Sequence, residues 1–135
     1  MLRVLKLGVK VIKIKGSADI AMDIKRIFAV REVMGDDVPI RLDLNAHWDT
    51  LGTIKTMKEA KDCHIQYLEQ PIPGWDLKGM ARIRDSIGIR LIADEGIWSA
   101  QDVVQIAELG ASDIINIKIS KTCGLPTAKK VEAGT

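Results

Sequence analysis

The strongest constraint on the fold is a repeat of about 25 residues, in which a short segment rich in β-branched residues precedes a segment with helical spacing of apolar residues. The repeat predicts strands over residues 9–15, 38–43, 65–69, 89–94 and 114–118. It predicts helices over residues 18–34, 50–63, 76–86 and 99–109, with another near 128–133. Strands that alternate with helices require a mostly parallel sheet covered by helices.

Two architectures satisfy this alternation: a doubly wound open sheet and a (β/α)8 barrel. The chain has 135 residues, and no linker or shift in composition divides it, so residues 1–135 are expected to form a single domain. A complete barrel needs about 250 residues. If the barrel is correct, the chain is a partial TIM barrel of five consecutive β–α units. A flavodoxin-like domain fits the length as well and predicts the strand order 2-1-3-4-5.

Composition removes several classes of function. The net charge of +2 is small and scattered, which argues against a nucleic-acid partner. No apolar run approaches the roughly 18 residues of a membrane helix, and the first 16 residues lack a signal-peptide pattern. Cys63 and Cys123 have no metal-like spacing and are expected to be free thiols. We therefore expect a cytoplasmic protein.

Carboxylates stand at the ends of three consecutive predicted strands: Asp43, Glu69 and Asp94. Neighbouring strands lie about 4.8 Å apart, so these three side chains can converge on one hard cation. A set of ligands made of oxygen alone suits Mg²⁺, or Mn²⁺ in its place. Without a cation, three clustered carboxylates would repel one another.

Lysines flank the acids in sequence. Lys13 and Lys15 are two residues apart on the first strand and so point to the same side, and Lys118 ends the fifth strand. In a closed barrel of eight strands, the first and fifth strands face each other, which places Lys118 opposite the pair. Amines on both sides of a metal-bound substrate can act as general base and general acid, and a lysine beside another cation is deprotonated more easily.

The motifs IKIKG, RLDLNAHWD, YLEQPIPGWD, IADEG and NIKISKTCG occur in this order. Together they resemble the muconate-lactonizing-enzyme (muconate cycloisomerase) branch of the enolase superfamily, within the mandelate racemase and muconate lactonizing enzyme family. The resemblance implies that Asp43, Glu69 and Asp94 bind Mg²⁺. It also implies that Lys15 is the general base, that Lys13 lowers the pKa of Lys15, and that Lys118 acts on the opposite face.

The resemblance further implies removal of a proton α to a carboxylate in a small-molecule substrate, through an Mg²⁺-stabilised enediolate. Cycloisomerase, racemase or epimerase, and dehydratase outcomes all belong to this chemistry. Asn45 and Glu95 are expected beside the ligands or the substrate, and Gln70 is expected to orient the ligand that precedes it. The family also has an N-terminal capping domain and further barrel strands, which we expect to be absent from these residues.

An alternative function is a truncated half-barrel that is not catalytic. Its open sheet edges would associate with a second copy, as a homo-oligomer, or with the missing half. Three tryptophans, Trp48, Trp75 and Trp98, follow the three acids by four to six residues. They either shape a substrate pocket or pack against the following helices.

Overall fold

The computed structural model describes residues 8–133. The strands are β1 (Ile12–Lys15), β2 (Ile40–Asp43), β3 (Ile65–Glu69), β4 (Arg90–Ala93) and β5 (Ile114–Ile115). The helices are α2 (Ile20–Met34), α3 (Thr50–Glu59), the 3-10 turn η1 (Lys61–Cys63), α4 (Leu77–Ile87), α5 (Ala100–Glu108) and α6 (Leu125–Glu132). Among the described residues, no helix combines the length and the apolar character that crossing a membrane requires.

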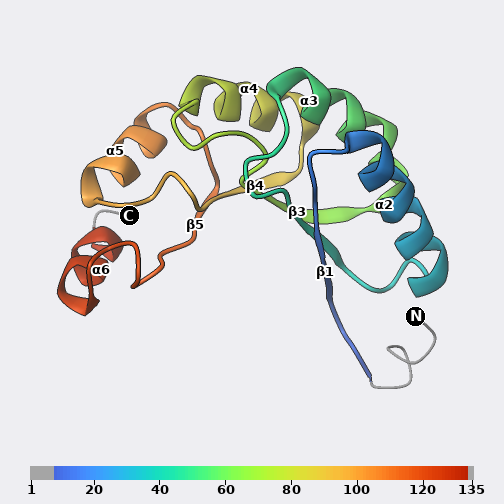
Figure 1. Ribbon diagram of the computed structural model, residues 1–135, viewed down its shortest axis with the longest axis horizontal. Helices are drawn as coiled ribbons and strands as arrows, with labels where there is room; N and C mark the ends of the chain where they lie inside the picture. The colour runs from blue at the N-terminus through green and yellow to red at the C-terminus, as the bar shows by residue number, and fades with distance from the viewer. Residues whose placement is uncertain (1–7, 134–135) are drawn as a thin grey trace.

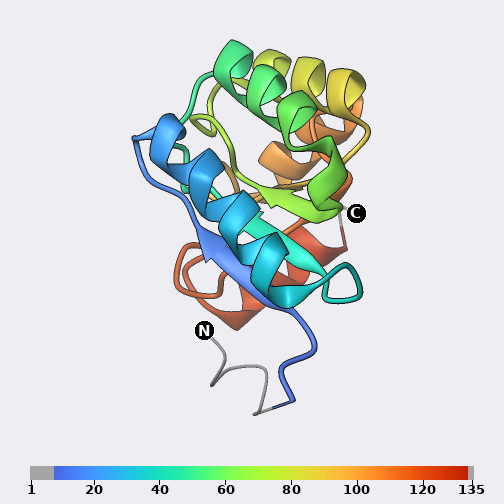
Figure 2. The same cartoon turned by 90° about the vertical axis from the view of Figure 1, so that its right-hand side faces the viewer.

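The five strands form one sheet in the order β1-β2-β3-β4-β5, and every neighbouring pair is parallel. Figure 1 shows the sheet as an arc with the helices on its convex side, and Figure 2 shows the same helical layer from the side. Strands that follow one another in space as they do in sequence, with helices on one face only, form part of a (β/α)8 barrel. The order 2-1-3-4-5 of a flavodoxin-like domain is excluded.

Side-chain hydrogen bonds cap the first turns of four helices. Asp19, Asp49 and Asp76 each accept a hydrogen bond from a backbone N–H in the first turn of the helix that follows. Ser99 and Asp102 form a reciprocal capping box at the start of α5. Because each cap lies just beyond a loop at the carboxyl end of a strand, it also fixes where that loop ends.

Several elements are shorter than predicted. The helix expected over residues 50–63 ends at Glu59, continues as η1 and stops at His64, whose φ of 47° is left-handed and ends helical pairing. The strands expected over residues 9–15, 38–43, 89–94 and 114–118 lose residues at their ends. The first and the fifth each lose three residues, which leaves the fifth as Ile114–Ile115, and the chain turns toward α6 beyond it.

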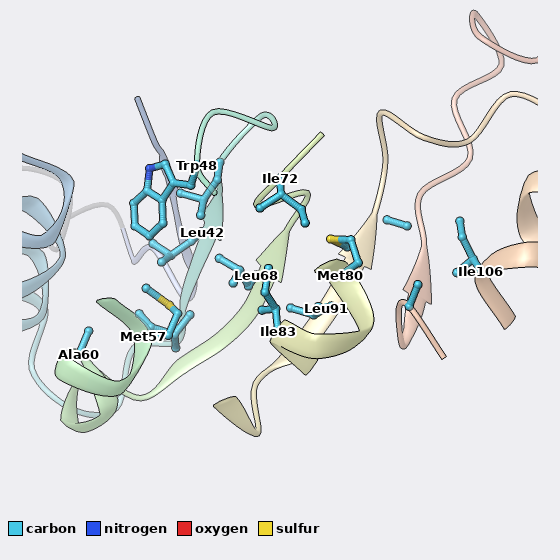
Figure 3. Packing of buried hydrophobic residues seen from close by; sticks show 14 of the residues in the cluster. Leu42, Trp48, Met57, Ala60, Leu68, Ile72, Met80, Ile83, Leu91 and Ile106 are labelled. Atoms are coloured by element: carbon cyan, nitrogen blue, oxygen red, sulfur yellow. The ribbon is translucent and has the colours of Figure 1, made fainter. Parts of the chain in front are cut away.

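The core lies between the sheet and the helices. Leu42, Leu68 and Leu91 come from the three central strands and are at most 1% exposed. Figure 3 shows these side chains near Met57, Met80 and Ile83 from the helical layer, with Ile106 of the same cluster farther along, beside β5. The opposite, concave face of the sheet carries the polar side chains described below.

A buried arginine joins the amino-terminal ends of the strands. The Arg31 guanidinium donates to the carbonyl oxygens of Cys63, Gly35 and Val38, with two bonds to Cys63 at 2.8 and 2.9 Å. Each carbonyl lies in a turn that leads into β2 or β3. Arg31 is only 8% exposed, and its two bonds to the Cys63 carbonyl are buried, so they satisfy a group that water does not reach.

Candidate active site

The carboxyl edge of the sheet brings the three predicted acids into one row. Asp43 and Glu69 end β2 and β3 and are register partners, and Asp94 directly follows β4. Asp43 is 1% exposed, Glu69 is 5% exposed and Asp94 is fully buried. A carboxylate buried to this degree needs a compensating charge or several hydrogen bonds.

Strand-like hydrogen bonds continue into the loops beyond the acids. The Leu44 N–H donates to the Glu69 carbonyl, and the Gln70 N–H donates to the Ile92 carbonyl. Asn45 and Ala46 have φ values of 45° and 61°, a left-handed pair that turns the chain sharply after Asp43. These loops therefore have defined conformations that hold the polar side chains at the edge.

Two lysines occupy one end of the acid row. The Lys13 ammonium contacts Asp43 Oδ2 at 2.8 Å and also forms an ion pair with Glu69 Oε2. Lys15 pairs with the same Asp43 oxygen and donates to Asn45 Oδ1 at 3.2 Å. The Lys13 and Lys15 side chains are 42% and 62% exposed, so both lie at the open surface of β1.

The other end of the row has two more lysines. Lys118 forms an ion pair with Asp94 Oδ2, and Lys121 contacts Asp94 Oδ1 at 2.8 Å. Asn116 Nδ2 lies 3.0 Å from Glu69 Oε1 and 3.4 Å from Asp94 Oδ2, so it links the second acid to the third. The sequence patterns did not indicate Asn116 or Lys121, although Asn116 precedes Lys118 by the two residues that place side chains on one face of a strand.

The residues expected beside the ligands form a second set of contacts. Asn45 Nδ2 donates to Glu95 Oε1 at 3.0 Å, and Glu95 Oε2 is buried without a hydrogen-bond partner among the described residues. Gln70, which is 1% exposed, was expected to orient Glu69. Its side chain instead accepts from the Asp94 N–H at 2.8 Å and donates to the Ile72 carbonyl, because the left-handed backbone at Gln70 turns it toward β4. Gln70 therefore anchors the backbone of the next acid.

The ion pairs shift the pKa values of both partners. Burial alone would raise the pKa values of Asp43 and Asp94, but hydrogen bonds from two lysines on each carboxylate outweigh it and lower both. Burial lowers the pKa of Lys13, yet its bonds to Asp43 and Glu69 raise it above 10.5. The bond to Asp94 raises the pKa of Lys118 as well. Among the described groups, carboxylates lie closer to Lys13 and Lys118 than other lysines do. Easier deprotonation of these lysines beside another cation therefore stays a prediction for the metal-bound site.

Within residues 8–133, no three His, Cys, Asp and Glu side chains are placed together as a ready-made metal site. The groups between the carboxylates are the Lys13 ammonium and the Asn116 amide. The donor chemistry still fits a hard divalent cation, because the three side chains are buried, ion-paired carboxylates at the ends of adjacent strands. A cation would have to displace ammonium groups from these oxygens.

The three tryptophans were expected either to shape a pocket or to pack against the following helices, and the structure shows both arrangements. Trp48 is 3% exposed, packs in the core and donates from its indole to the Ser17 carbonyl. Trp75 and Trp98 are 83% and 59% exposed. They line a hollow of about 470 Å³ that also reaches Glu95 and lies between the loops after β3 and β4. Gly74 and Gly96 let those loops approach closely, since a Cβ added at Gly74 would lie 2.6 Å from backbone atoms of Gly96.

Comparisons with known proteins agree with this architecture. The model of the family described as enolase C-terminal domain-like matches residues 1–133. The L-Ala-D/L-Glu epimerase of Clostridium acetobutylicum is 36% identical over 128 residues, which cover 93% of this chain and 36% of that enzyme. Muconate cycloisomerase 1 of Rhodococcus opacus is 30% identical over 118 residues, which cover 87% of this chain and 32% of that enzyme.

A solved structure also matches the fold of this chain. The crystal structure of a dipeptide epimerase from Enterococcus faecalis, complexed with Mg and the dipeptide L-Leu-L-Tyr, superposes with a TM-score of 0.91 at 34% identity. The match covers 98% of this chain and 38% of that one. Fold, acid row and sequence together define a partial barrel of the enolase superfamily. The chain belongs to the enolase C-terminal domain-like family, in the branch of mandelate racemase and muconate lactonizing enzyme. It spans little more than a third of the length of these relatives.

Proposed function

We propose that this chain carries the metal-binding and proton-transferring edge of an isomerase that removes a proton α to a carboxylate in a small substrate. One observation carries the proposal: three buried carboxylates on adjacent parallel strands stand in a row with lysines at both ends. Buried acids in such number, at the edge where barrel enzymes place their active sites, serve no evident packing purpose.

Asp43, Glu69 and Asp94 are the residues that would hold Mg²⁺, or Mn²⁺ in its place. When bound there, the cation would supply electrostatic stabilisation of the negative charge that develops on the substrate carboxylate. The relatives whose structures contain Mg, such as the dipeptide epimerase of Enterococcus faecalis, support this assignment. Asn45, Glu95 and Gln70 would keep the acids and the loops beside them in place.

The two lysines of β1 are suited to different tasks. Lys13 contacts two carboxylates, which raise its pKa and keep it a cation. Lys15 contacts one carboxylate and an amide and is the more exposed of the two. We therefore assign Lys15 as the base and Lys13 as its charged partner. Lys118, at the far end of the acid row, would return or remove a proton on the other face of the substrate.

Among the isomerase outcomes, epimerisation or racemisation fits this arrangement best. An amine at each end of the row permits proton removal on one face of a carbon and proton return on the other. Several relatives are named for this outcome, among them the L-Ala-D/L-Glu epimerase of Clostridium acetobutylicum. We propose a dipeptide or a related amino-acid derivative as the substrate class.

Titration calorimetry of the chain with MgCl₂ tests the metal site. The unaltered chain is expected to bind Mg²⁺, and Asp43→Asn or Asp94→Asn is expected to abolish binding because each variant removes a buried anionic ligand. Asp36→Asn, an exposed acid after α2, is the matched control and should bind normally. The absence of any binding by folded, unaltered chain at millimolar Mg²⁺ would refute the proposal.

Proton exchange tests the base. With L-Ala-L-Glu in D₂O and Mg²⁺, NMR is expected to show deuterium at the α carbon of the Glu residue, and Lys15→Ala is expected to stop its incorporation. The rate measured with the unaltered chain is the reference for the variant. Exchange that continues in Lys15→Ala would contradict the assignment of the base.

Association without catalysis is the second candidate, and one observation favours it. Next to β5, Ile119 and Leu125 are 52% and 60% exposed and line a shallow apolar hollow with Ile117 and Ala128. Such a surface on an open edge of a sheet favours pairing with another segment or a second copy. Size-exclusion chromatography with light scattering discriminates the two, since a stable monomer that binds Mg²⁺ would contradict a role limited to association.

A further inference from the structure

Lys121 differs from the other lysines of the site in its burial. Its side chain is 15% exposed, whereas those of Lys13, Lys15 and Lys118 are 42%, 62% and 43% exposed. Holding an ammonium group in so enclosed a position costs solvation free energy unless strong partners replace water. Lys121 has three such partners, and all three lie at the end of β4.

The first two partners belong to Asp94. Lys121 Nζ contacts Asp94 Oδ1 at 2.8 Å and donates to the Asp94 carbonyl oxygen. The third partner is the ring of Trp98, whose centroid lies 5.8 Å from the ammonium, within the range of a cation–π contact. Lys121 therefore holds both the side chain and the backbone of one acid.

Trp98 is itself fixed at two points. Its indole N–H donates to the Glu95 carbonyl at 3.0 Å, and its backbone N–H donates to Asp102 Oδ2 at 3.0 Å. The segment that carries Lys121 is also defined, because the N–H groups of Lys121 and Thr122 both donate to the Lys118 carbonyl. The ammonium thus joins two ordered loops, the one after β4 and the one after β5.

The two oxygens of Asp94 consequently have different surroundings. Oδ1 contacts Lys121, and Oδ2 contacts Lys118 and lies 3.4 Å from Asn116 Nδ2. Because the same Asn116 amide donates to Glu69 Oε1, Oδ2 is the oxygen on the side of the acid row. A cation shared by the three acids would meet Asp94 at Oδ2.

We propose that Lys121 is a positioning residue that holds Asp94 through Oδ1 and thereby presents Oδ2 to the metal. This inference rests on the metal site of the proposed function. It also separates the tasks of the two lysines on Asp94. Lys118 can leave Oδ2 for the metal and the substrate, because Lys121 continues to compensate the buried carboxylate. Residues that hydrogen-bond a metal ligand in this way commonly contribute about 10- to 100-fold to metal affinity.

Calorimetry with MgCl₂ on three variants of the chain tests the role. Lys121→Met, which keeps the aliphatic stem and removes the charge, is expected to weaken Mg²⁺ binding at least about 10-fold. Lys121→Arg retains a charged donor and is expected to recover part of the affinity. Lys130→Met, an exposed lysine on α6, is the matched control for net charge and should bind as the unaltered chain does. Thermal unfolding without metal checks that the variants fold, and Lys121→Gln replaces Lys121→Met if that variant does not.

The outcomes separate this inference from the proposed function. If the unaltered chain binds Mg²⁺ and Lys121→Met binds as tightly or more tightly, the positioning role is overturned while the metal site stands. An equal loss in Lys121→Met and Lys130→Met would also overturn it, since net charge alone would explain the loss. If the unaltered chain binds no Mg²⁺, the metal site fails, and the role of Lys121 fails with it.

Discussion

The carboxylates of the candidate site stand on the central strands, whereas its amines come from the edges. β2, β3 and β4 are paired on both sides, and the acids at their ends are at most 5% exposed. β1 and β5 each pair on one side, and three of the four lysines that they or the following loop contribute have side chains more than 40% exposed. The exception is Lys121, at 15%.

This difference indicates that the acids and the lysines have different structural roles. Groups on paired, covered strands are held in place by the core beneath them, which suits metal ligands that must keep a fixed geometry. Groups on edge strands keep more rotational freedom, which suits amines that exchange partners during proton transfer. In the arc of Figure 1, strands that closed the barrel would cover the edges and bury the lysines.

The largest expected change in the free energy of unfolding comes from a substitution in the core beneath the central strands. Leu68→Ala on β3 removes a fully buried side chain and is expected to lower the free energy of unfolding by about 2–5 kcal/mol, through lost apolar contact and a cavity. Urea denaturation measures it. Leu125→Ala on α6, where the side chain is 60% exposed, is the control and should change stability by less than about 0.5 kcal/mol. Equal effects at the two sites would break the contrast between covered and open regions.

A smaller loss of stability is expected for the buried arginine at the amino-terminal end of the sheet, opposite the acids. Arg31→Met keeps most of the side-chain volume but leaves three carbonyl groups without their donor, and is expected to cost about 2 kcal/mol. Arg82→Met, an exposed arginine on α4, is the control in the same denaturation experiment. A loss no larger than that of the control would show that water replaces the guanidinium at these carbonyls.

The buried cysteine is expected to make a smaller contribution to stability, and this contribution depends on pH. Burial raises the pKa of the Cys63 thiol above 9.0, although the charge of Arg31 acts in the opposite direction. Above pH 9 the unfolded thiol loses its proton before the folded one, so this contribution to stability is present below pH 9 and is lost as the pH rises through the folded pKa. Denaturation midpoints between pH 8 and 10 are expected to fall less steeply in Cys63→Ala than in the unaltered chain.

Thiol labelling provides the control for that comparison. Both cysteines are free, with Cys63 buried and Cys123 exposed, so a thiol reagent should label Cys123 rapidly and Cys63 only on unfolding. Rapid labelling of both in the native protein would contradict the burial of Cys63.

The smallest effect on stability is expected at the edge. Lys15→Gln removes an ion pair whose lysine side chain is 62% exposed, so the unfolding free energy should change by less than about 1 kcal/mol. The same substitution is expected to abolish α-proton exchange, because it removes the proposed base. A stability loss as large as that of Leu68→Ala would mean that β1 is held mainly by this ion pair.

Much of this arrangement was predictable because it depends on local pattern. The β–α repeat predicted five parallel strands, and the end of each strand predicted where Asp43, Glu69 and Asp94 would gather. The strand bounds were less accurate, since pairing with neighbours decides them, as the short β5 shows. The orientation of Gln70 toward Asp94 depended on a left-handed backbone that no residue pattern indicated.

The sequence by itself determined the alternation of strands and helices and the position of each acid at the end of a strand, because both periods are set by nearby residues. The tertiary structure decided the strand order, which separates a barrel from a flavodoxin-like sheet. Only the tertiary structure decided which amine meets which oxygen. Lys121 lies 27 residues from Asp94 along the chain, and Asn116 lies 47 residues from Glu69. Their contacts depend on how two loops pack at the edge of the sheet, where distances of a few tenths of an ångström decide whether a hydrogen bond forms.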